Sequence, residues 1–191
     1  MIRPMSAQPA TAGRPASRPS ADHRIAAGDP RLDAWRAFLQ AHARLFRRLD
    51  EELRAEHGLS LPEYDALLQI AQAPDRRLRM SRLASRVLLS KSGVTRLVDR
   101  LVADGLVERT QCSSDARGAE ATLTSVGLAR LRAAAPTHLR GIDSYFISAL
   151  EPADLTLLER TMDAITRRTG DTPAASDADA GCDPADGARG G

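Results

Sequence analysis

The sequence is poor in cysteine and in aromatic residues, and it lacks any long hydrophobic run. Only two cysteines, Cys112 and Cys182, occur in 191 residues, which excludes a disulfide framework and a Cys-x-x-Cys metal site. No apolar stretch reaches the roughly 18 residues of a membrane-spanning helix. The arginines near the N-terminus are not followed by the apolar segment of a secretory signal. We therefore expect a cytoplasmic protein.

The recognisable motifs of enzymes are also missing. The sequence contains no P-loop, no Gly-x-Gly-x-x-Gly, no nucleophile elbow and no pair of carboxylates at a catalytic spacing. Its histidines lie too far apart along the chain for the spacings of a zinc site; they are His23, His42, His57 and His138. These absences predict a protein that is not an enzyme and has no cofactor and no bound metal.

The charges are spread unevenly, although the net charge is only +2. Residues 76–100 contain seven arginines and one lysine against one aspartate, a net charge of +7. Such a basic segment inside a folded region indicates a polyanionic partner such as DNA. The alternative is an ordinary solvated helix face.

The two ends of the chain differ in composition from its middle. Residues 1–29 are rich in Pro, Ala, Ser and Arg, and residues 171–191 consist mostly of Ala, Asp and Gly, with five aspartates and one arginine. Neither segment can bury enough apolar surface to offset the entropy of ordering, so both are expected to be disordered tails.

Between the tails, the apolar pattern predicts mainly helices. Residues 30–57 repeat apolar side chains every three or four positions, and Gly58 ends that helix. Ser60 and Glu63 form a capping box at the start of a second helix that ends near Pro74. A third helix covers 80–87, and a fourth follows Ser90 and ends at Gly105.

The next segment predicts a β-hairpin and then two further helices. Residues 106–112 and 119–123 are expected to form two strands, which a polar turn connects. A helix capped by Thr124 or Ser125 is expected to run to about Leu150, with a kink or break at Pro136. Pro152 suits the first turn of a last helix.

A helix, a short turn, a second helix and a hairpin, in this order, are typical of a winged helix-turn-helix. The fold class expected is mainly α with a small β-hairpin wing, plus a helical dimerisation domain. The fourth helix would enter the major groove, which admits one helix. Its polar face offers hydroxyls and cations to bases and phosphates; the residues predicted to bind DNA are Ser90, Lys91, Ser92, Thr95, Arg96 and Arg100.

The stretch LSKSGVTRLVDRLVADGLVER at 89–109 resembles the recognition helix and first wing strand of the multiple-antibiotic-resistance regulator (MarR) family. Residues 115–118, DARG, followed by Leu123-Thr124 and Gly127, resemble that family's wing tip and next helix. The resemblance covers about residues 30–168. It implies that Asp115 braces the wing and that Arg117 contacts the minor groove or a phosphate. The family often has a second arginine where this chain has Ala116, so the wing contact is expected to be weaker.

The resemblance further implies a homodimer whose dimerisation helices are 30–58 and 124–168, flanking a DNA-binding domain at 60–123. A two-fold dimer would bind double-stranded DNA at a palindromic operator. The expected function is transcriptional repression, with release by a small aromatic ligand; the ligand-binding residues are unknown. His42 and His138 could line a ligand cavity, although a satisfied core histidine is the commoner role.

Two other functions remain open from the sequence. The same basic surface would serve an architectural protein that coats DNA without sequence preference. Alternatively, the winged domain could bind a protein, as part of an interaction module or an unrecognised enzyme.

Overall fold

The structure is a computed structural model that describes residues 28–87, 90–111 and 119–169. The chain divides into two compact units, Met1–Phe38 and Leu39–Gly191. In the first unit the described residues are those that begin the long helix α1 (Arg31–His57), where Trp35 and Phe38 stack with ring centroids 5.9 Å apart. The predictions for the two tails, for Cys112 and Cys182 and for His23 lie outside the described residues.

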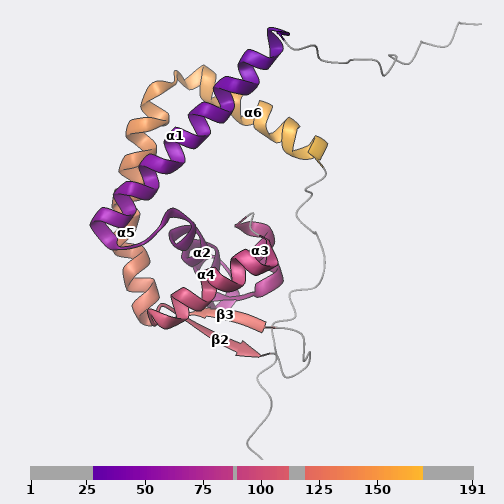
Figure 1. Ribbon diagram of the computed structural model, residues 1–191. Helices are drawn as coiled ribbons and strands as arrows, with labels where there is room; N and C mark the ends of the chain where they lie inside the picture. The colour runs from indigo at the N-terminus through magenta and orange to yellow at the C-terminus, as the bar shows by residue number, and fades with distance from the viewer. Residues whose placement is uncertain (1–27, 88–89, 112–118, 170–191) are drawn as a thin grey trace, which may run out of the picture. The chain divides into compact units, whose positions relative to one another are not determined.

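The second unit contains the rest of α1 and the remaining elements, which Figure 1 shows. In chain order these are α2 (Leu61–Ala71), a 3-10 turn η1 (Pro74–Arg76), β1 (Arg77–Arg79), α3 (Met80–Arg86), α4 (Lys91–Ala103), β2 (Val107–Gln111), β3 (Ala119–Leu123), α5 (Ser125–Tyr145), a 3-10 turn η2 (Ile147–Ala149) and α6 (Pro152–Thr169).

The wing sheet has three antiparallel strands rather than the two of the expected hairpin. Their order is β1-β3-β2, and β3 pairs with both neighbours. Val107 lies opposite Leu123 in one pair, and Leu78 lies opposite Ala121 in the other. The third strand, β1, has only three residues, so its alternation was too short to stand out in the sequence.

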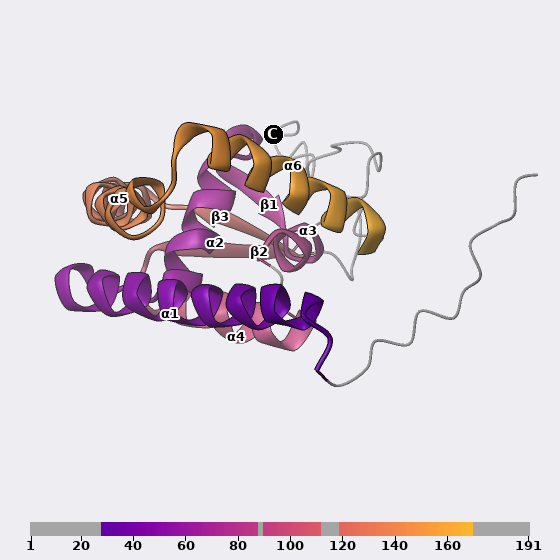
Figure 2. The same cartoon turned by 90° about the horizontal axis from the view of Figure 1, so that it is seen from above.

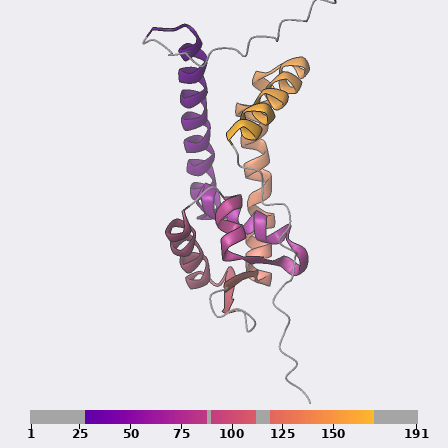
Figure 3. The ribbon, with the colours of Figure 1, turned by 90° about the vertical axis from the view of Figure 1, so that its right-hand side faces the viewer.

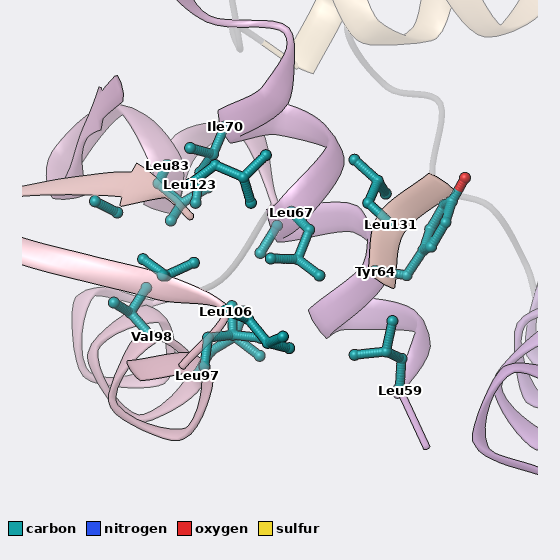
Figure 4. Packing of buried hydrophobic residues seen from close by; sticks show 14 of the residues in the cluster. Leu59, Tyr64, Leu67, Ile70, Leu83, Leu97, Val98, Leu106, Leu123 and Leu131 are labelled. Carbon is teal, nitrogen blue, oxygen red and sulfur yellow. The ribbon is translucent and has the colours of Figure 1, made fainter. Parts of the chain in front are cut away.

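A single apolar core lies around α2, which contacts α3, α4, α5, β1 and β3. Figure 2 shows α2 beside the strands and α3. The side chains in this core are Leu, Val, Ile and Ala, with one aromatic residue, Tyr64. Figure 4 shows how they interdigitate; the largest fully buried ones are Leu53, Leu59, Leu67, Ile70, Leu83, Leu97, Leu101, Val94, Val98 and Val107.

The helix ends are capped as the sequence predicted. At the start of α2 the Ser60 hydroxyl accepts a hydrogen bond from the Glu63 amide at 3.3 Å, and the Glu63 carboxylate accepts one from the Ser60 amide at 2.9 Å. Thr124 caps α5 by accepting from the Gly127 amide at 2.9 Å. After α4 the backbone turns into the left-handed region at Gly105, where φ is +68°, and this conformation favours glycine.

One expectation for α5 is wrong, because the helix, which Figure 3 shows from the side, ends at Tyr145 instead of continuing to Leu150. Of the kink or break expected at Pro136, the break is absent. Pro136 is exposed, so water can bond the carbonyl that loses its helical partner. Beyond Tyr145 the chain tightens into η2 before α6 begins.

The C-terminal half of α1 packs closely against α5. A Cβ atom added to Gly141 would lie 2.5 Å from the Leu49 side chain, so the small residue permits this approach. Nearby, the buried Thr137 hydroxyl donates to the Glu56 carboxylate at 2.6 Å and lies 2.9 Å from His57 Nε2. These contacts join the helix that precedes the winged domain to the helix that follows it.

Candidate nucleic-acid interface

Helix α4 begins at a serine cap that exposes polar groups at its N-terminal end. The Ser90 hydroxyl accepts a hydrogen bond from the Gly93 amide at 3.1 Å and lies 3.2 Å from the Ser92 hydroxyl. Both serines are exposed. The remaining amides of the first turn and the helix dipole favour an anion at this end.

The two faces of α4 differ sharply in burial. Its inner face is almost completely buried in the core; the residues are Val94, Leu97, Val98 and Leu101. On the opposite face Ser92, Arg96 and Asp99 are exposed, and Thr95 is half-buried. The buried stripe fixes the rotation of the helix, so Ser92 and Arg96 must face solvent.

Arg100 lies one turn beyond Arg96 and is held by the protein itself. Its Nε atom donates to Glu63 Oε1 at 3.0 Å, and its Nη1 atom donates to the Arg96 carbonyl at 3.4 Å. Burial by itself would raise the pKa of Glu63, but hydrogen bonds from Ser60 and Arg100 outweigh burial and hold that pKa below its usual value. The carboxylate is therefore charged at neutral pH.

A second ion pair connects α4 to the wing. Arg109 on β2 donates to the Asp99 carboxylate at 3.2 Å. Arg109 follows the glycine turn that ends α4, so this contact spans the joint between the helix and the strand. The pair is largely exposed, so it contributes little to the stability of the fold. We expect it to orient β2 relative to α4.

The joint between α1 and α2 carries a further network. Asp50 Oδ1 accepts from the Leu61 amide at 2.8 Å, and its Oδ2 accepts from Arg54 at 2.7 Å. Burial would raise the pKa of Asp50, but the bonds from Arg54 and Leu61 lower it overall. Asp50 therefore fixes the N-terminus of α2 to α1.

Three of the residues predicted to bind DNA cannot be placed in full. The wing-tip residues Asp115 and Arg117 lie outside the described residues, and the same is true of the Lys91 side chain. The sequence reasoning missed Glu63 and Arg109 as partners of α4. Glu63 was visible as a capping residue, but nothing in the sequence pointed to its contact with Arg100.

A histidine and a tyrosine meet where α2 packs on α5. The rings of Tyr64 and His138 lie 4.4 Å apart between centroids, and His138 Nδ1 is buried without a hydrogen-bond partner among the described residues. Burial lowers the pKa of His138, and the nearby Asp65 only partly opposes this effect. His138 is therefore neutral at pH 7 and packs, half-buried, against Tyr64. His42 instead stacks on Phe46 along α1.

The described residues give no sign of a metal or membrane role. Among them, no group of three or more His, Cys, Asp or Glu side chains is arranged to hold an ion. Within the same residues, no helix combines the length and the apolar character needed to cross a bilayer.

Comparison with known proteins identifies the arrangement of helices and wing. Residues 57–118 match the model of the MarR family. The chain is 35% identical over 94 residues to the HTH-type transcriptional repressor YetL of Bacillus subtilis, and the match covers 49% of this chain and 56% of YetL. The aligned part thus spans little more than half of that relative.

Solved structures match over a longer part of the chain. The MarR family regulator AbsC from Streptomyces coelicolor is 33% identical, with a TM-score of 0.71, and the match covers 76% of this chain and 97% of AbsC. Sco3205 from the same organism, solved in complex with DNA, is 30% identical with a TM-score of 0.74, over 80% of this chain and 95% of Sco3205. The chain therefore belongs to the MarR family of winged helix-turn-helix DNA-binding transcriptional regulators, as residues 89–109 indicated, and is not an enzyme.

Proposed function

We propose that this protein is a cytoplasmic repressor that binds a palindromic operator as a homodimer. The observation that carries the proposal is the polar face of α4. That face presents the Ser90 and Ser92 hydroxyls and the Arg96 guanidinium to solvent, while the opposite face is locked into the core. Arginine binds guanine bidentately in the major groove, and serine hydroxyls bind phosphates or base edges.

The roles of the separate residues follow from their positions. We assign base reading to Arg96 and Thr95, and phosphate contacts at the helix N-terminus to Ser90, Lys91 and Ser92. On the family resemblance, Asp115 is assigned to bracing the wing, and Arg117 to the minor groove or a phosphate. A second α4 from a partner subunit, about 34 Å away, would read the next turn of the duplex and so require a palindrome.

Exposed apolar side chains on the terminal helices support a dimer. A soluble chain rarely exposes many large apolar residues without a partner to cover them, and α1 and α6 carry six; these are Trp35, Phe38, Leu39 and Phe46 on α1, and Leu157 and Ile165 on α6. The charged residues of α1 lie between these positions, as in an amphipathic helix. We expect a dimer in analytical ultracentrifugation, and a monomer at all concentrations would contradict the proposal.

The experiment that tests DNA recognition starts by selecting binding duplexes from a randomised library with the wild-type protein. Arg96→Ala should then lose about 1–3 kcal/mol of discrimination between the selected duplex and a shuffled duplex of equal composition. Arg132→Ala removes an exposed arginine from α5 and serves as the matched control. If Arg96→Ala discriminates between the two duplexes as well as the wild type does, Arg96 on α4 does not read the base sequence.

The same selection separates repression at an operator from DNA coating. An architectural protein would enrich no sequence and would bind selected and shuffled duplexes equally, with the same steep salt dependence. An enriched inverted repeat supports the regulator.

Release by a small aromatic ligand is the second part of the proposal, and its support is the family alone. A panel of phenolic carboxylates, titrated into the complex with the selected duplex, tests this part directly. A ligand that dissociates the complex without unfolding the protein would support it, and a panel without effect would leave repression controlled by other means.

A further inference from the structure

We propose that Glu63 determines specificity by holding Arg100 on the protein, so that this arginine does not bind DNA phosphates beside the base-reading face of α4. The inference rests on the DNA-binding function proposed above. It gives Glu63, a residue of α2, a role in recognition although it lies outside the recognition helix.

The geometry shows how Arg100 is held. Its guanidinium bonds the Glu63 carboxylate on α2 and the backbone carbonyl of Arg96 on α4, at 3.0 and 3.4 Å. The Arg100 side chain is nevertheless 58% exposed. It therefore lies at the surface, and a variant without the Glu63 charge would leave it able to reach a nearby phosphate.

Glu63 is a rigid and charged acceptor. Its side chain is only 13% exposed, and Oε2 is fixed by the Ser60 amide at 2.9 Å while Oε1 faces Arg100. Because the capping box already immobilises the carboxylate, little further entropy is lost when it pairs with Arg100. A pre-organised anion of this kind can compete with a phosphate that must be brought to the site.

The position of Arg100 explains why this matters for recognition. Arg96 and Arg100 are four residues apart, so their side chains are neighbours on the helix surface. A free Arg100 would add a phosphate contact that is equally strong on every sequence and carries no sequence information. A genome offers a great excess of non-specific sites. Suppressing that contact therefore raises the ratio of specific to non-specific affinity, which governs how often an operator is occupied.

The test measures the salt dependence of binding to the shuffled duplex for wild type, Glu63→Gln, Arg100→Gln and the double variant. Glutamine at position 63 can keep the capping-box bond while losing the charge. Glu63→Gln should bind the shuffled duplex about ten-fold more tightly at low salt, with a log–log slope steeper by about 0.9 per subunit. Arg100→Gln should have the wild-type slope, and the double variant should return to it.

The matched control is Glu51→Gln. Glu51 pairs with Arg47 and Arg48 on α1, with contacts of 3.9 and 3.8 Å, so this variant makes the same charge change away from α4. It should leave the slope unchanged. Melting curves for every variant establish that each one is folded.

Three results would overturn the inference. A slope that falls in Arg100→Gln means that Arg100 already contacts a phosphate in the wild type. An unchanged slope in Glu63→Gln means that the pair is structural only, and an equal increase in Glu51→Gln means that net charge alone is responsible. The proposed regulator function fails separately, if the wild-type protein enriches no duplex; the slope of Glu63→Gln on a duplex of random sequence then still tests the role of Glu63.

Discussion

The contact between the start of α5 and the start of β2 leaves no room for a side chain at Gly127, and Gly127→Ala measures that constraint. An added Cβ would lie 2.0 Å from the Leu106 carbonyl oxygen and 2.8 Å from the Leu123 side chain. Carbon and oxygen atoms normally come no closer than about 3.3 Å, so the helix must move away by about 1 Å. The Leu106 oxygen also accepts from the Thr124 amide at 3.1 Å. The Thr124 hydroxyl donates to the Gly105 carbonyl at 2.8 Å and lies 3.1 Å from the Leu106 oxygen, and that movement weakens these bonds.

The expected cost follows from these terms. Overpacking against a backbone atom costs about 1–3 kcal/mol, and the weakened hydrogen bonds add about 1 kcal/mol. The better helix propensity of alanine returns at most about 1 kcal/mol. The net loss is about 2 kcal/mol, which corresponds to a decrease in Tm of about 4–8 °C for a chain of this size.

Thermal unfolding followed by circular dichroism, at one fixed protein concentration, provides the assay. Gly105→Ala is the matched control, because Gly105 has φ of +68° and nothing within 4 Å of an added Cβ. It should lose only about 1 kcal/mol, from backbone strain. If Gly127→Ala has the same Tm as the wild type, or is destabilised less than Gly105→Ala, the reasoning from close packing is refuted.

Two further substitutions test the joints of the fold. Asp50→Ala leaves the buried Leu61 amide without its acceptor and should lower the free energy of unfolding by about 1–2 kcal/mol in urea titrations; an unchanged midpoint would show that water replaces the carboxylate. His138→Phe keeps the ring against Tyr64 but removes its titration. Burial holds the pKa of His138 below its unfolded value, so the native state binds fewer protons and wild-type stability should fall as the pH drops below about 6.5. The variant should lose less stability than wild type between about pH 7.5 and about pH 5.5, and an equal loss would assign the acid sensitivity to other groups.

The local features of this fold could be predicted from sequence because each depends on neighbouring residues. The capping box of Ser60 and Glu63, the cap at Ser90 and the left-handed glycine at position 105 all involve groups within a few positions of one another. Helical periodicity likewise revealed the buried stripe of α4, and with it the face that carries Arg96.

The features that could not be predicted depend on residues far apart in the chain. Glu63 meets Arg100 across 37 positions, and the sequence offers many acids that could have paired with that arginine. Strand β1 exists because β3 provides an edge for it, since three residues cannot establish a strand by pattern. Periodicity around a proline does not reveal whether the helix continues beyond it, as α5 does beyond Pro136.

The ion pairs around α4 suggest why only part of a strongly basic segment is presented to DNA. Arg100 is neutralised by Glu63, and Arg109 by Asp99. Of the arginines on and next to α4, these pairs leave Arg96 as the one whose side chain lies on the exposed face without an acid among its described contacts. If all three cations were unpaired, affinity would rise on every sequence alike, because phosphate contacts do not distinguish bases. A regulator that must find one site needs a difference in affinity between sites. In the function proposed above, the carboxylates of Glu63 on α2 and Asp99 on α4 increase that difference, because they occupy two cations and leave the side chain of Arg96 unchanged.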